Sequence, residues 1–322
     1  MVPGLIGPAA ASGIEHASSW RLVFLALLPL VAVAAYLALP VLSRTAPAEP
    51  GGDLAGAGGG DERDDRRRDV LVLVAGVGLL LGGLGAREVA LTVVLVAAGA
   101  LPAVWAFLRL VPPGTVALQR GMPAAVAARG VLTFAFFGAD AYVSLAVTKA
   151  HGAPTWMAGL ALTAATLTWT AGSWVQQRVV VTRGPRWLVR RGFAVIAAGI
   201  GVLTVSLGPV PAPVPLTVLA WAIGGLGIGL AYAPISVTVL GTAAPGEEGR
   251  ASASLHLTDV LGVALGTGLS GVFVALGDGR GWTTASSLTI AFLVTLAVAV
   301  AGAVVAGRLP AALPGVEAKG AR

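Results

Sequence analysis

Cysteine is absent from the 322-residue sequence, and histidine occurs only three times. The chain therefore forms no disulfide and offers no thiolate nucleophile or thiolate metal ligand. His16, His151 and His256 lack the spacing of a metal-binding motif, and no glycine-rich phosphate loop followed by lysine occurs. We expect neither a bound metal nor another cofactor.

Charged residues are also scarce, at 11% of the chain, whereas hydrophobic residues make up 56%. A soluble domain carries roughly 25% charged residues, so this composition excludes one. The 45 glycines fit helices that pack closely in a bilayer, where small residues allow backbones to approach each other. The composition therefore indicates a membrane protein.

Apolar stretches occupy nearly the whole chain, and most are long enough to cross a ~30 Å hydrocarbon core, which takes roughly 20 helical residues. They lie at residues 1–15, 21–42, 70–85, 88–111, 124–149, 156–179, 186–208, 215–242, 250–277 and 284–307. The sequence predicts an all-α polytopic membrane protein with about ten transmembrane helices.

Polar and proline-rich interruptions divide the chain into six parts. Residues 43–69 are rich in proline and glycine and then densely charged, so they are expected to form a cytoplasmic loop. The charged run 61–69 is interpreted as a solvated face, with a regulatory or lipid-binding site as the alternative. The other predicted parts are two helices at 1–42, a central helix pair at 70–111, a cytoplasmic linker at 112–123, a six-helix bundle at 124–308 and a cytoplasmic tail at 309–322.

Basic residues collect on one side of this topology. Most of the 21 lysines and arginines fall at 43–69, 109–123, 178–191, 243–250 and in the C-terminal tail. Only Arg21, Arg87, Lys149 and Arg280 fall on the other side. The positive-inside rule places the basic side in the cytoplasm, which predicts a multi-pass inner-membrane protein with a cytoplasmic C-terminus. Because topology explains the net charge of +6, we expect no nucleic-acid partner.

The segment "PGLIGPAAASGIEHASSWRLVFLALLPL" at 3–30 resembles the fifth and sixth helices of drug:proton antiporters of the major facilitator superfamily. Its match to the Gly-x-x-x-Gly-Pro-x-x-x-Gly-like antiporter motif and the Ser-Trp-Arg run that follows comprises Gly4, Gly7, Pro8, Gly13, Trp20, Arg21, Phe24 and Pro29. An ordinary kinked span is the alternative for the motif itself. The resemblance implies a major facilitator-type bundle that is N-terminally incomplete, with the ten spans corresponding to helices five to fourteen of the fourteen-helix branch.

A second resemblance lies at residues 159–192, which look like the helix and cytoplasmic gating loop of the superfamily's second-half Gly-x-x-x-Asp-Arg-x-Gly-Arg-Arg signature. Gly172 matches, Gln176 stands where Asp is usual, and the basic part shifts to Arg183 and Arg186. The resemblance therefore does not extend to charge gating by an aspartate in this loop.

Ionisable residues inside spans carry the sharpest functional information, because a charge at bilayer depth costs about 3 kcal/mol on insertion scales. Asp140 is interpreted as a residue of proton coupling or cationic-substrate binding, with a structural hydrogen bond to a neighbouring helix as an equal alternative. Asp259 follows His256 by three positions, so the two share a helical face. They form either a proton relay or an intrahelical pair. Arg129 is expected to extend to the membrane surface rather than to pair with Asp140, which is about 16 Å of helix rise away.

Aromatic residues in spans suggest an apolar cavity for amphipathic compounds, with ordinary packing as the alternative. They are Phe134, Phe136, Phe137, Tyr142, Trp169 and Tyr232, of which Tyr142 and Trp169 are candidate substrate contacts. The polar residues inside the spans do not assemble a nucleophile, a base and an oxyanion donor, so an enzyme is not expected.

Together, these features and the resemblance imply a secondary active transporter. The expected activity is proton-coupled efflux of small apolar or amphipathic compounds by alternating access, with the bilayer, the substrate and protons as partners. The alternative is a non-transporting fragment or assembly partner of such a transporter.

Overall fold

The computed structural model describes residues 60–86, 88–208 and 212–312, together with residues 21, 22, 25, 28, 29 and 31–37. Within these residues every regular element is helical and no strand occurs. The described residues among 21–37 are all helical, in agreement with the expected span there. The expected helix at 1–15 and the motif residues Gly4, Gly7, Pro8 and Gly13 lie outside the described part.

Among the described residues, six helices are long and apolar enough to cross a membrane, namely α4, α5 with η2, α6, α7, α8 and α9 with η3. The elements in order are α3 (Gly60–Leu84), α4 (Val89–Leu110), α5 (Met122–Leu145), η2 (Ala146–Ala150), α6 (Thr155–Ser206), α7 (Val214–Gly241), α8 (Glu248–Arg280), α9 (Thr284–Val305) and η3 (Ala306–Arg308). The predicted all-helical class is confirmed for the described residues, and the length and composition of these helices suit a membrane-embedded protein. The total of about ten spans stays a prediction.

Helix α6 contains two of the expected spans. A straight helix of its 52 residues would be about 78 Å long, more than twice the hydrocarbon thickness. It bends instead at Gly184, whose φ of 72° and ψ of 168° favour glycine. Along the first arm, Ala165 approaches Gly225 of α7 and Gly172 approaches Gly229. Because both series of numbers rise together, the first arm runs parallel to α7.

The second arm of α6 runs the other way. Gly192 lies against Ala231, and Gly199 lies against Gly224, so the residue numbers rise on one helix while they fall on the other. Both arms thus pack on α7 in opposite directions. The chain reverses at Gly184, as expected for two spans joined by a short connection.

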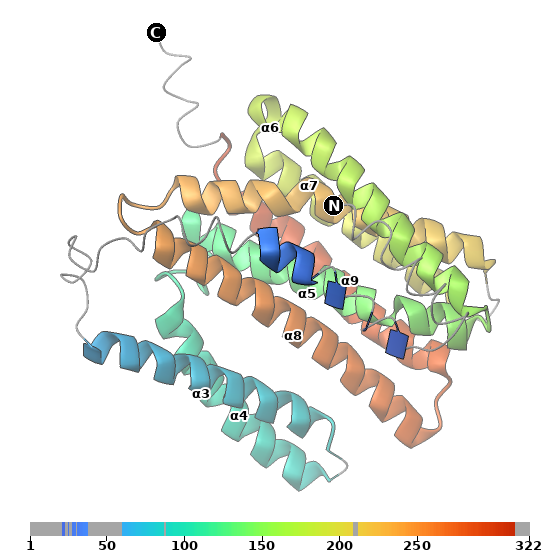
Figure 1. Cartoon of the computed structure of the whole chain (residues 1–322). Helices are drawn as coiled ribbons and strands as arrows, with labels where there is room; N and C mark the ends of the chain where they lie inside the picture. The colour runs from blue at the N-terminus through green and yellow to red at the C-terminus, as the bar shows by residue number, and fades with distance from the viewer. Residues whose placement is uncertain are drawn as a thin grey trace.

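The helices form two flanking groups around a centre (Figure 1). Helices α6 and α7 lie on one flank, and the α3–α4 pair lies on the other, next to α8. Between them α5 packs against α8, where Gly130 approaches Thr258 and Gly138 approaches Gly266. Helix α9 meets the second arm of α6, where Gly302 touches the ring of Phe193.

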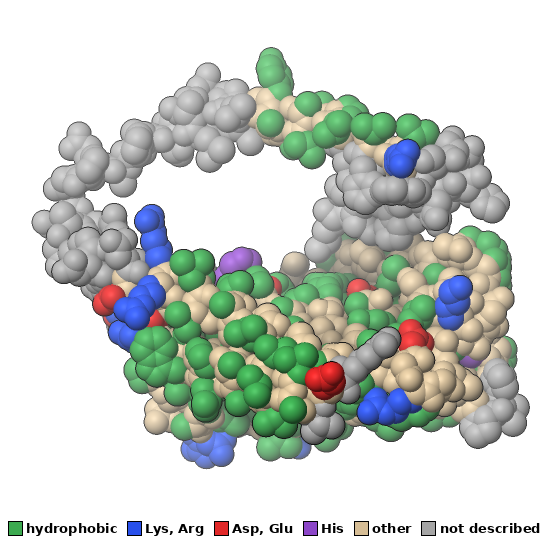
Figure 2. Space-filling view, turned by 90° about the horizontal axis from the view of Figure 1, so that it is seen from below, with side chains coloured by type: hydrophobic (Ala, Val, Ile, Leu, Met, Phe, Trp, Pro, Cys, Tyr) green, Lys and Arg blue, Asp and Glu red, His purple; other side chains and the backbone are tan. Residues whose placement is uncertain are grey.

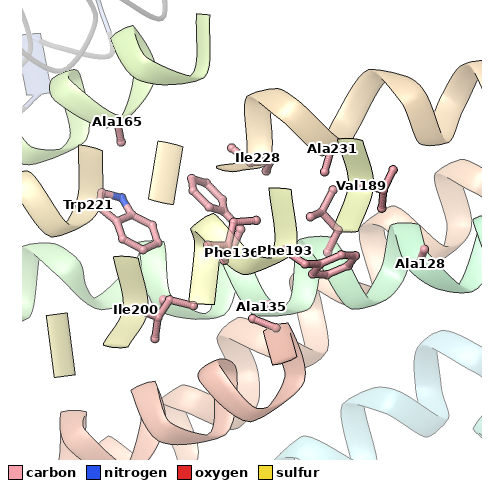
Figure 3. Packing of buried hydrophobic residues seen from close by; sticks show 14 of the residues in the cluster. Ala128, Ala135, Phe136, Ala165, Val189, Phe193, Ile200, Trp221, Ile228 and Ala231 are labelled. Carbon is pink, nitrogen blue, oxygen red and sulfur yellow. The ribbon is translucent and has the colours of Figure 1, made fainter. Parts of the chain in front are cut away.

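Large side chains fill the core between α5, α6 and α7 (Figure 3). Phe136 and Trp221 stack with ring centroids 4.9 Å apart and an interplanar angle of 20°. Phe193 and Ile228 are fully buried in the same cluster. This packing holds α5 and α7 in a defined register, which positions the polar residues described below.

The charged run before the first central helix differs from its predicted loop structure. Residues 60–69, expected within the loop 43–69, form the start of α3. The run contains no proline, its four arginines favour a helix nearly as strongly as Leu, and most of its acidic residues come near the N-terminus of α3, where the helix dipole stabilises negative charge. Asp69 is buried and pairs with Arg109 of α4 at 3.5 Å, so the charged end of α3 is anchored to its neighbour.

Several connections meet at one end of the bundle. Arg186, after the bend in α6, donates from Nε to the Leu309 carbonyl at 2.6 Å. The Arg308 guanidinium donates to the Leu118 carbonyl at 3.2 Å, and the Gly121 amide donates to the Arg308 carbonyl at 3.3 Å. The loop before α5, the α6 bend and the segment after α9 therefore lie together, as their predicted placement on one side of the topology requires.

Candidate functional site

Asp140 lies on α5 and is half-buried. Its Oδ1 accepts a hydrogen bond of 2.8 Å from Nε1 of Trp221, a fully buried residue of α7. The interhelical hydrogen bond expected as one alternative for Asp140 is thus present. A single hydrogen bond occupies only part of the acceptor capacity of a carboxylate, so the bond does not exclude a proton-binding role.

Five rings form an aromatic cluster beside Asp140, made up of Phe136, Phe137, Trp169, Trp221 and Tyr232. Trp169 lies 5.7 Å from Phe136 and 5.8 Å from Tyr232 between ring centroids. Phe137 packs edge-on against Phe136 at 5.2 Å. The aromatic cluster therefore extends without a break from Trp221, beside Asp140, to Tyr232.

Arg129 is only 1% exposed, so our expectation that it extends to the membrane surface is wrong. The guanidinium turns inward to α7, where it donates to the Tyr232 carbonyl at 2.9 Å and to the Ser236 hydroxyl. It also lies 3.5 Å from the centroid of the Tyr232 ring, in a cation–π contact. A buried arginine needs a counter-charge, which α8 supplies.

Asp259 is that counter-charge. Its Oδ1 lies 3.8 Å from Arg129 Nε, and its Oδ2 accepts a 3.1 Å hydrogen bond from the Tyr232 hydroxyl. The Asp259 side chain is 21% exposed, so the pair is reached from one side. Three buried atoms of the pair make no hydrogen bond within the described residues, namely Nε and Nη1 of Arg129 and Oδ1 of Asp259. The pair balances charge but retains free hydrogen-bonding capacity.

The expected partner of Asp259 lies elsewhere. His256 is exposed, one turn earlier on α8, and within the described chain it makes no hydrogen bond to Asp259. The carboxylate turns to α5 and α7 instead, because the buried guanidinium of Arg129 is the stronger attraction. The geometry therefore joins Asp259 to Arg129 and Tyr232, and not to His256.

Two hydroxyl groups join α5 to α8. Tyr142 donates to the Thr267 carbonyl at 3.1 Å, and Thr133 donates to the Asp259 carbonyl at 3.0 Å. Tyr142, a candidate substrate contact from the sequence, thus holds two helices together in this structure. Trp169, the other aromatic candidate, belongs to the aromatic cluster.

The residues of the expected gating loop spread along α6. Gly172 and Gln176 are buried before the bend, and Gly172 touches the backbone of α7. Arg183 is exposed, with its guanidinium 5.7 Å from the centre of the Trp187 ring, and Arg186 bonds to the Leu309 carbonyl. Gln176 supplies no charge at this position, and the basic residues gather at the bend beyond it.

A small polar group lies at the opposite end of α5. His151 Nε2 lies 3.2 Å from the Thr217 hydroxyl, which lies 3.2 Å from the Ser206 hydroxyl. Partial burial lowers the pKa of His151, because the cationic imidazolium loses hydration there. The group connects the ends of α5, α6 and α7.

Sequence reasoning missed Trp221 and Ser236 as partners of the charged residues. For Trp221 a signal existed, because it lies within an apolar span and not at a membrane interface, where indole rings are most frequent. For Ser236 none did, since its role depends on which helix faces Arg129. No model of a known protein family matches the chain, and no curated protein matches it.

Proposed function

We propose that this protein is a secondary active transporter of the major facilitator type, which exports small apolar or amphipathic compounds in exchange for protons by alternating access. The observation that carries the proposal is the half-buried carboxylate of Asp140, held by Trp221 beside the aromatic cluster. Ionisable residues within apolar spans are rare, and they usually mark substrate or proton paths.

The aromatic cluster supports an amphipathic substrate. Phe136 and Trp221 are buried, but Phe137, Trp169 and Tyr232 are partly exposed and offer flat apolar surface. Asp140, beside the buried end of the cluster, offers an acceptor for a cationic or hydrogen-bonding group. Binding sites for small molecules commonly combine apolar and aromatic walls with a few placed polar groups. A lipophilic cation matches both parts of this site.

The Arg129–Asp259 pair supports a conformational role. It joins α5, α7 and α8 through one network, and Asp259 is partly exposed. In the proposed cycle, α8 moves relative to α5 when this network separates. The backbone contact of Gly130 with Thr258 permits such sliding between close-packed helices.

The proposed location is the inner membrane, with the basic end of the bundle and the C-terminus in the cytoplasm. The connections that meet near Arg186 and Arg308 are rich in arginine, as the positive-inside rule requires of cytoplasmic loops, and include Arg120, Arg178, Arg183, Arg190 and Arg191.

The test is efflux of a fluorescent lipophilic cation from cells that express the chain, with and without a proton uncoupler. We expect gradient-dependent efflux that Asp140→Asn abolishes at equal membrane expression. Asp278→Asn is the matched control, because it makes the same change at an exposed position near the end of α8. Efflux that continues unchanged in Asp140→Asn would remove Asp140 from the mechanism, and absence of efflux from the correctly inserted parent chain would contradict the transport proposal.

A second variant tests whether the orientation of the Asp140 carboxylate matters, while its charge is kept. Trp221→Phe keeps a ring in the core but removes the donor to Asp140, so we expect efflux to weaken without being abolished. Trp174→Phe, at an exposed position on α6, is its control. Equal efflux by both variants would mean that the Trp221 hydrogen bond has no part in transport.

A further inference from the structure

Two neighbouring cavities lie between the α3–α4 pair and helices α5 and α8, and together they are called the cleft here. Its inner part is a cavity of about 410 Å³. The cavity is lined mainly by Leu73, Val77, Phe107, Phe134, Leu261 and Leu265. The hydroxyls of Thr115 and Thr258 also line it, but each donates to a carbonyl of its own segment, at 2.6 Å to Pro112 and at 3.1 Å to Ser254. The inner part thus presents apolar surface with its polar groups already satisfied.

The end of the same cleft is basic. A second cavity of about 380 Å³ lies between the same helices, one to two turns further along each. It is lined by Arg66 of α3, Arg109 of α4 and Arg250 of α8. The one acidic residue among its described lining residues is Glu247, which lies 3.7 Å from Arg250 in a largely exposed ion pair. Behind Arg109 stands the buried Asp69, which orients its guanidinium at 3.5 Å. Even with Asp69 included, positive charge exceeds negative charge at this end.

The surface over this flank repeats the pattern. Figure 2 shows hydrophobic side chains over the face that carries α3 and α4, with basic and acidic side chains towards both ends, including a group where α3 begins. Leu71, Leu101 and Val104 of these helices are exposed. An apolar face with charges towards its two ends suits a bilayer whose hydrocarbon covers the face and whose headgroups meet the charges.

The length of the cleft matches one leaflet. Leu265 follows Arg250 by 15 positions on α8, which corresponds to about 22 Å of helix rise. Half of a bilayer, with its headgroup region, is about 20–22 Å thick. A lipid whose headgroup lies at the arginines would therefore reach the inner end of the cavity with its acyl chain.

From the apolar cavity, the basic end and this length, we propose that the cleft binds one anionic phospholipid, which couples the α3–α4 pair to the bundle. The phosphate accepts hydrogen bonds from the guanidinium groups of Arg66 and Arg250, beside Arg109, and one acyl chain fills the apolar cavity. Basic clefts between membrane helices are suited to anionic headgroups for this reason. Direct contact between α3 and α8 is limited, with Leu81 touching Gly268 and Leu73 packing near Leu261, so the acyl chain supplies much of the missing contact. The proposal does not depend on the transported substrate.

The test is native mass spectrometry of the full chain released from nanodiscs of phosphatidylcholine and phosphatidylglycerol at 3:1. We expect one phosphatidylglycerol to remain bound to each chain in preference to phosphatidylcholine. Arg66→Gln combined with Arg250→Gln should reduce this retention at least tenfold. The matched control is Arg178→Gln combined with Arg190→Gln, which removes the same charge from exposed positions on α6 and should leave retention unchanged.

A third variant tests the acyl-chain part. Ala127→Phe puts a ring into the apolar cavity and should displace the bound lipid without altering the arginines. The proposal is overturned if the Arg66/Arg250 variant retains phosphatidylglycerol as the parent does, or if the parent retains both lipids in proportion to their abundance. A loss in the Arg178/Arg190 control equal to that in the Arg66/Arg250 variant would also overturn it, because it would reflect net charge and not this cleft.

Discussion

The buried pair of Arg129 and Asp259 provides the sharpest test of the site. Arg129→Met removes the guanidinium and leaves the Asp259 carboxylate with one hydrogen bond, from Tyr232. Asp259→Leu leaves a 1% exposed guanidinium without a counter-charge. The double variant replaces both charges by apolar side chains of comparable length, so no uncompensated charge remains.

The separation of 3.8 Å sets the scale of the effect. At an effective dielectric constant of about 20, two unit charges at this distance attract by about 4 kcal/mol. Removal of one partner of a buried pair typically costs about 3–5 kcal/mol, whereas apolar replacement of both is often neutral. We therefore expect each single variant to lose about 3 kcal/mol of unfolding free energy, and the double variant to be no less stable than the worse single variant.

The measurement is the unfolding free energy of the four proteins in mixed micelles, from a denaturing-detergent titration followed by tryptophan fluorescence. Arg250 and Glu247 provide the control pair, because their charges are 3.7 Å apart but 66% and 57% exposed. Their coupling should be at most about 1 kcal/mol. Additive effects of Arg129→Met and Asp259→Leu would refute the reasoning, since they would show that the two charges do not interact despite their burial.

Three further predictions concern backbone, pH and topology. Gly184→Ala should lower the thermal midpoint, because its backbone conformation is nearly restricted to glycine, at a cost of about 1–3 kcal/mol for another residue, and because the new Cβ would also collide with the Ala311 carbonyl. Gly201→Ala, in open space within the helix, should raise it slightly, and a midpoint unchanged by Gly184→Ala would contradict the bend. Because burial lowers the pKa of His151, the unfolded chain binds more protons than the folded chain as pH falls below about 6.5. Stability should therefore decline there, and less steeply in His151→Gln. Since the chain lacks cysteine, Arg190→Cys should react with an impermeant maleimide only from the cytoplasmic side and Lys149→Cys only from outside, and the reverse pattern would invert the proposed orientation.

The positions of the helices show where prediction from the sequence succeeded. The long apolar stretches predicted the helices, because a segment in lipid must satisfy its backbone hydrogen bonds internally and a helix does so locally. The stretch 215–242, for instance, corresponds to α7 at Val214–Gly241 within one residue at each end. The charged run 60–69 was predicted less well, because a proline-free run with acidic residues first and arginines after them can extend a helix beyond its apolar part.

The partners of the charged residues inside the spans could not be predicted from the sequence. Asp140 and Asp259 stood out in the sequence because they are charged residues in apolar stretches. Their partners Trp221 and Arg129 lie 81 and 130 positions away, so helix packing alone brings them together. Arg129 illustrates the limit, since the same side chain could extend outward to the surface or inward to a counter-charge.

The sequence by itself determined the apolar character of the protein, its helical class and which charged residues lie within apolar segments. These features depend on composition and on local backbone hydrogen bonding. Only the tertiary structure decided that Arg129 faces Asp259, that Asp140 bonds to Trp221, and that Arg66, Arg109 and Arg250 meet at one cleft. The physical reason is that each of these contacts joins different helices, and their rotation and register follow from the packing of the whole bundle.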